Sequence, residues 1–184
     1  MTVRFSSHIL RFILAVLVLV GVIGLLSYIG PARIVENLGF ENVYLTVFVL
    51  AIVGGVSALT AAGFYATVFS LALGGANPFI LALFSAPGVL LGDLIFWYLG
   101  VEGRRIIENG YGGYLSKFTS WLKTRPKWFT PVVVYVYTGF TPFPGDFLMF
   151  ALALIKYKFK QIFIPTLLGN YTLALIVSAM ASMF

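Results

Sequence analysis

Two acidic residues, Asp93 and Asp146, lie inside long apolar stretches of the sequence, where few other side chains can do chemistry. Burying a carboxylate at the centre of a bilayer costs about 2.5–3.5 kcal/mol on insertion scales, so such a residue usually faces a cavity, a partner or a substrate path. Each is therefore a candidate transport residue. Structural roles stand beside this one: Asp146 could cap a helix over Phe147–Ile155, and Asp93 could bond to a buried amide such as that of Asn170.

The composition around these acids indicates a membrane protein. Of 184 residues, 60% are hydrophobic and 10% charged, whereas soluble domains carry about 25% charged residues. The sequence thus excludes a water-soluble globule and predicts one all-α integral membrane domain of about four to six helical elements. Cysteine is absent and His8 is the single histidine, which excludes disulfides and thiolate or histidine metal sites. No phosphate-binding loop or Ser/His/Asp set occurs, so we expect neither an enzyme nor a cofactor.

Apolar runs and the charges between them divide the chain into helical segments. The first predicted region, residues 1–42, consists of a spanning helix at 9–29 and a surface connector. The second, residues 43–184, is the main membrane domain. Within this domain we expect spans at 78–101 and 162–184, broken apolar hairpins at 43–77 and 132–155, and a polar amphipathic loop at 102–131. Because Lys and Arg favour the cytoplasmic side, the N-terminus and this loop are predicted to be cytoplasmic in a multi-pass protein of the cell membrane.

Basic and aromatic residues beside the apolar runs are the expected interfacial anchors. These are Arg104, Arg105, Trp121, Trp128, Lys156, Lys158 and Lys160. For the loop at 102–131, a plain tethering helix in the interface is favoured over substrate binding. The net charge is +6, but the cations flank apolar runs instead of forming a tract, so anionic lipid headgroups are the expected partner and nucleic acid is not. A homo-oligomer is compatible with this pattern.

The positions of the cations predict that both broken hairpins are re-entrant, which means that each enters and leaves the membrane on the same side. The hairpin at 132–155 has cations on both sides, so both of its ends should lie on the cytoplasmic side. Its break at Pro142-Phe143-Pro144-Gly145 falls where a hairpin tip must be. Each arm has about ten residues, or about 15 Å of helix, which is half of a hydrocarbon core of about 30 Å. The hairpin at 43–77 should enter from the opposite leaflet.

An internal repeat agrees with this topology. The segment Phe84–Asp93 is similar to Phe163–Asn170, because each contains Phe, Pro, Leu-Leu and Gly in that order and ends on Asp or Asn. Apolar sequences also produce Leu-Leu-Gly by chance. A true repeat would give a hairpin and a spanning helix twice, with inverted topology, which is the plan of many secondary transporters with a site between the repeats.

The order of these motifs resembles the DedA family, also called the SNARE-associated or VTT-domain family. The resemblance covers roughly residues 43–184 and rests on Gly92-Asp93, Trp97-Tyr98 and Gly100, and on Pro142-Phe143-Pro144-Gly145-Asp146 followed by a basic turn. It looks closest to a divergent prokaryotic branch. The resemblance implies opposed re-entrant hairpins and translocation of undecaprenyl phosphate or phosphatidylethanolamine, or phospholipid scrambling. A family glutamate, expected near Ala66 or Thr67, and an arginine, expected at 139–141, are absent here.

The sequence thus predicts a transporter that moves a lipid or lipid-linked phosphate between leaflets through a cavity between the hairpins. Burial disfavours the charged form of the two acids, so proton-linked transport is one prediction. The residues expected at the transport or lipid-binding site are Gly92, Asp93, Pro142, Pro144, Gly145, Asp146 and Asn170. Two alternatives share these features: an exporter of a small amphiphilic or ionic solute, and a non-transporting membrane scaffold whose aspartates only cap and pack.

Overall fold

The computed structural model describes residues 43–55, 58–107, 124–141 and 145–181, together with isolated positions at 10, 11, 13, 14, 16, 17, 20, 21, 120 and 183. Within these residues all regular structure is α-helical, as the sequence predicts. Most of the predicted first span at 9–29, the connector up to residue 42 and most of the segment 108–123 lie outside the described residues.

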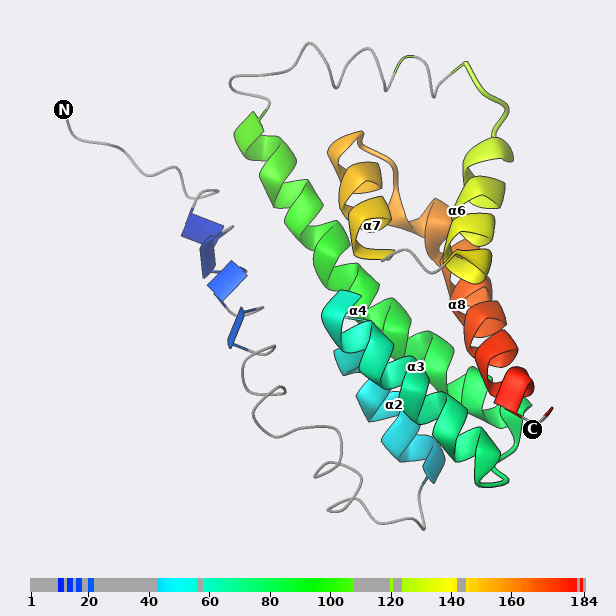
Figure 1. The fold of residues 1–184 in the computed structure, drawn as a ribbon. Coiled ribbons are helices and arrows are strands. Elements are labelled where there is room, and N and C mark those ends of the chain that lie inside the picture. The colour runs from blue at the N-terminus through cyan, green and yellow to red at the C-terminus, as the bar shows by residue number, and fades with distance from the viewer. Residues whose placement is uncertain are drawn as a thin grey trace.

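Two long helices, α4 (Pro78–Ile107) and α8 (Phe159–Ala181), run side by side through the molecule (Figure 1). Their 30 and 23 residues correspond to about 45 and 35 Å of helix. Both helices are long and apolar enough to cross a membrane. The predicted spans at 78–101 and 162–184 fall in these helices, although α4 continues six residues further than predicted and α8 begins three residues earlier.

Four shorter helices pack around this pair: α2 (Val43–Gly54), α3 (Ala58–Leu73), α6 (Phe129–Phe140) and α7 (Gly145–Leu154). In Figure 1, α2 and α3 occupy the lower part of the view, and α6 and α7 the upper part. The packing is crossed, because α2 packs on α4 and α3 on α8, whereas α6 packs on α8 and α7 on α4. Each pair lies within a segment predicted as a broken hairpin, apart from the first residues of α6.

Polar and apolar side chains are distributed unlike those of a soluble protein. Large apolar side chains are exposed along both long helices, among them Phe79, Leu83, Leu91, Leu94 and Ile95 on α4 and Ile164, Leu168, Ile176 and Met180 on α8. Polar side chains are buried in the same helices, namely Ser85, Asp93, Glu102, Thr166, Asn170 and Ser178. The exposed residues form continuous apolar faces, which mark contact with an apolar partner or solvent.

The second short helix of each pair ends in the same turn. Beyond the helix, two backbone N–H groups donate to carbonyls of the last turn, which is the Schellman arrangement: Gly75 to Ala72 and Ala76 to Leu71 after α3, Lys156 to Ala153 and Tyr157 to Leu152 after α7, all at 3.0–3.1 Å. The turn needs one residue at positive φ. This residue is Gly75 (φ 91°) in the first case and Lys156 (φ 64°) in the second.

The two turns predict opposite stability effects for two substitutions. At positive φ, a residue with a side chain costs about 1–2 kcal/mol of stability relative to glycine. Lys156→Gly should therefore stabilise the protein by about 1 kcal/mol, and Gly75→Ala should destabilise it by a similar amount. The thermal unfolding midpoint in detergent measures both effects. Lys158→Gly is the control, since Lys158 does not have a positive φ; an equal gain from this control would show that the turn is not the cause.

Candidate functional site

Near the middle of the two long helices, the side chains of Asp93 and Asn170 form a buried hydrogen bond. The amide Nδ2 of Asn170 donates to Oδ2 of Asp93 at 2.9 Å, and the two side chains are 2% and 4% exposed. Asn170 is therefore the amide partner that the sequence offered as one alternative for Asp93. Because the bond joins α4 to α8, it fixes the register of the two helices at this point.

Both helix pairs reach α4 at the position of this bond. Gly55, at the end of α2, lies so close to Gly92 that a Cβ on Gly92 would overlap its backbone. Gly145, the first residue of α7, lies so close to Asp93 that a Cβ on Gly145 would be 2.7 Å from Oδ1. The predicted site residues Gly92, Asp93, Gly145 and Asn170 are therefore brought together, and both glycines are needed for the close approach.

The second predicted acid, Asp146, lies in the first turn of α7. It is near enough to Asp93 for the two carboxylates to interact electrostatically. The expectation that Asp146 caps a helix beginning at Phe147 is wrong, because α7 already begins at Gly145. A carboxylate in a first turn still interacts favourably with the helix dipole, so the physical role resembles the predicted one.

Several predicted residues fall elsewhere or cannot be placed. Pro142, Pro144 and Trp121 and the side chain of Arg105 lie outside the described residues, whereas Trp128, Lys156, Lys158 and Lys160 are exposed at the ends of helices. The guanidinium of Arg104 donates from Nη1 to the carbonyl of Ala153 at 2.8 Å, so Arg104 ties the end of α4 to the end of α7. Its predicted role as an anchor to lipid headgroups misses this contact.

Other buried polar groups were missed by the sequence analysis. Glu102, assigned to the polar loop, is 2% exposed near the end of α4, because the helix continues past residue 101. Among the described residues, the hydroxyls of Thr46, Ser85 and Thr166 and the indole N–H of Trp97 are buried without a hydrogen-bond partner. Apolar sequences tolerate Ser and Thr at many positions, so nothing in the sequence singled out the three hydroxyls, and Trp97 was noted only as part of the motif after Asp93.

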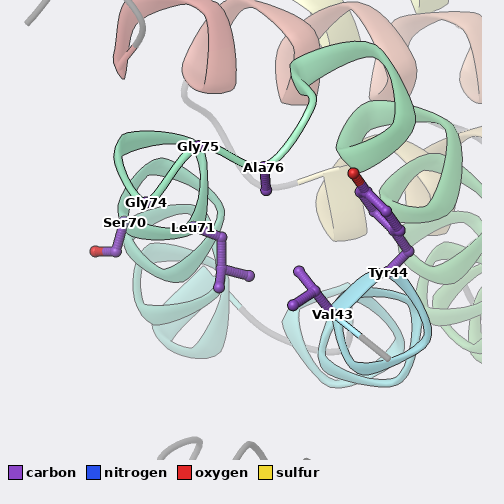
Figure 2. Close-up of a pocket in the computed structure, with 7 residues that line it drawn as sticks. All are labelled: Val43, Tyr44, Ser70, Leu71, Gly74, Gly75 and Ala76. Atoms are coloured by element: carbon purple, nitrogen blue, oxygen red, sulfur yellow. The ribbon is translucent and has the colours of Figure 1, made fainter. Parts of the chain in front are cut away.

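A pocket of about 450 Å³ lies at the opposite end of α2 and α3 from Asp93. Figure 2 shows that its lining comes from the start of α2, the end of α3 and the turn after it. The hydroxyl of Tyr44, which lines it, accepts a hydrogen bond from the backbone N–H of Asn77 at 3.3 Å. The lining includes no charged side chain, so the pocket is distinct from the site at Asp93.

No model of a protein family, no curated protein and no solved structure matches the chain. The resemblance to the DedA family therefore stays a prediction that rests on the motifs around Gly92-Asp93 and Gly145-Asp146.

The close approach of Gly92 to Gly55 predicts a strong effect of one methyl group. Gly92→Ala should destabilise the protein by about 1–3 kcal/mol, because the new Cβ would meet backbone atoms that cannot move aside cheaply. The matched control is Gly63→Ala in α3, where a Cβ would meet nothing within 4 Å and the higher helix propensity of alanine is mildly stabilising. Equal unfolding midpoints for the two variants in detergent would contradict the contact.

Proposed function

We propose that this chain is an integral membrane transporter of the DedA type, which moves a lipid or lipid-linked phosphate between the two leaflets. The observation that carries the proposal is the buried Asp93–Asn170 bond at the level where both pairs of short helices end on α4. A polar pair at this depth is costly in an apolar medium and marks a functional site by default.

The dimensions of the helices support a membrane location. Only α4 and α8, among the described helices, are long enough to cross a hydrocarbon core of about 30 Å. The four short helices have 10–16 residues, or about 15–24 Å. We therefore propose that α2–α3 and α6–α7 are re-entrant hairpins that enter from opposite leaflets. The exposed apolar faces of α4 and α8 would then contact lipid.

Three features support an inverted repeat of α2–α4 and α6–α8. The crossed packing is the first, since each leading short helix packs on the long helix of its own unit and each second one packs on the other. The shared turns at Gly75 and Lys156 are the second. The third is that Gly92 packs on the end of α2 and Gly169 on the end of α6. In such a repeat Asp93 and Asn170 occupy equivalent positions.

The hairpin ends supply a route for a polar headgroup. Non-helical backbone at the depth of a bilayer is tolerated only where it is buried in protein or lines a water-filled cavity. The connections at Gly55 and Gly145 both meet α4 beside Asp93. A headgroup that passes between the hairpins would meet polar groups there, while its acyl chains remain in contact with the apolar outer faces.

The topology predicts which positions can be labelled from each side of the membrane. Cysteine at Lys127 and at Lys158, before and after the α6–α7 pair, should react with an impermeant maleimide from the same side, and cysteine at Gly74 from the opposite side. All three positions are exposed, and the chain contains no native cysteine. Labelling of Lys127→Cys and Lys158→Cys from opposite sides would show that α6–α7 crosses the membrane.

Lipid translocation tests the function directly. In proteoliposomes with acyl-labelled fluorescent phospholipids, wild-type protein should accelerate loss of inner-leaflet fluorescence to an external quencher, and Asp93→Asn should reduce this rate at least tenfold. The amide retains the volume of the side chain but removes the charge. Glu102→Gln is the matched control, because it makes the same change in the same helix, about 13 Å away, and should retain the wild-type rate.

The same vesicles separate the two alternative functions from this one. A wild-type rate equal to that of empty liposomes, with a folded protein, would contradict lipid translocation. Uptake of a small cationic or anionic dye by those vesicles would then favour a solute exporter. Absence of both activities would favour a scaffold in which Asp93 and Asn170 only hold α4 and α8 together.

A further inference from the structure

Among the described helices α2–α4 and α6–α8, no basic side chain lies at the depth of the Asp93 carboxylate. Helices α2, α3, α6 and α7 contain no Lys, Arg or His, and the cations of α4 and α8 lie near helix ends, at Arg104, Arg105 and Lys160. The N-terminus of α7 faces Asp93, but Asp146 shares that terminus. A carboxylate buried in this way must either take up a proton or lie beside a cation.

Neutral oxygen atoms beside Asp93 distinguish between these two possibilities. Because Asn170 donates to Asp93 through Nδ2, the oxygen Oδ1 of the same amide is not used in that bond and can coordinate a cation. One helical turn before Asn170 lies Thr166, which is 0% exposed and whose hydroxyl has no partner among the described residues. Residues four apart lie on the same face of a helix, so Thr166 follows Asn170 along the seam between α4 and α8.

One turn beyond Asp93, α4 carries a second polar group. The residue four positions after Asp93 is Trp97, on the same side of α4, and its ring packs against Phe159 of α8 with the ring centroids 5.5 Å apart. Its indole N–H is buried without a partner among the described residues. An N–H donates only, so it suits a water molecule that completes the shell of a bound ion.

We propose that Asp93, Asn170 and Thr166 bind a monovalent metal cation, Na⁺, with one carboxylate and two neutral oxygens as ligands. A bound proton would use Asp93 alone and would leave the hydroxyl of Thr166 and the indole N–H of Trp97 buried without partners, which costs free energy. Hard cations take oxygen ligands of this kind. The proposed ligand set carries one negative charge, that of Asp93, so it suits a cation with one positive charge.

Binding of the ion does not depend on the transport function. Its role would be to couple lipid movement to a Na⁺ gradient, and that role rests on the function proposed above. The site joins α4, α8 and the start of α7, so an ion bound there would hold together elements that must separate if a headgroup is to pass between the hairpins.

Thermal unfolding in detergent tests the site with Na⁺ itself as the probe. At constant pH and ionic strength, replacing choline chloride by NaCl should raise the unfolding midpoint of the wild type saturably, by about 5 °C or more at a hundredfold excess over the dissociation constant. Potassium should have little effect. Thr166→Val and Asp93→Asn should abolish the rise, and Thr166→Ser, which retains the hydroxyl, should preserve it.

The matched control is Thr46→Val, which removes another buried hydroxyl without a partner among the described residues and should leave the Na⁺ response intact. An unfolding midpoint that is the same in choline chloride and in NaCl would overturn the proposal. So would a Na⁺-dependent rise of the midpoint that persists in Thr166→Val. So would stabilisation by low pH together with no Na⁺ dependence at any fixed pH.

If Thr166→Val fails to fold, binding of radioactive ²²Na⁺ to wild type and Thr166→Ser decides, because a Na⁺ site requires saturable binding to both. Na⁺ binding without lipid translocation would support the ion site while contradicting the transport function.

Discussion

The hydrogen bond between Asp93 and Asn170 is the interaction on which the arrangement of the other elements depends. Its two side chains are almost completely buried, so each must find its partner inside the protein. This fixes α4 against α8 and determines where the short helices can approach. Gly92 and Gly145 leave room for the two connections beside Asp93, and any larger residue at either position would push a helix pair away from the carboxylate.

Backbone groups impose the second constraint, because an apolar medium offers no partner for the ends of helices. The start of α4 is closed by Asn77, whose side chain accepts hydrogen bonds from Phe79 and Ile80 at 2.9 and 3.4 Å, and Pro78 lacks an N–H there. The ends of α3 and α7 are closed by the Schellman turns.

The sequence predicted the helical class, the two long helices and the breaks between short ones, because these follow from the lengths of apolar runs and from Gly and Pro. It also named Asn170 as a partner that Asp93 could have, as the structural alternative to a transport role. Contacts that depend on packing were not predictable. Glu102 was assigned to a loop because the sequence does not show that α4 continues past residue 101. Nothing in the sequence indicates that Lys156 adopts positive φ. Thr166 looks like an ordinary residue of an apolar helix.

The pairing of Asp93 with an asparagine instead of a second acid has an electrostatic consequence. Two carboxylates at the separation of Asp93 and Asn170 would repel each other, and one of them would have to be protonated for the helices to pack. The amide removes this repulsion and donates the hydrogen bond that holds α8 to α4. Within this pair only Asp93 can carry a negative charge, and the nearby carboxylate of Asp146 adds to the negative potential there. The pair therefore holds the two helices together without repulsion between its own side chains, while the charge of Asp93 remains for a ligand to balance.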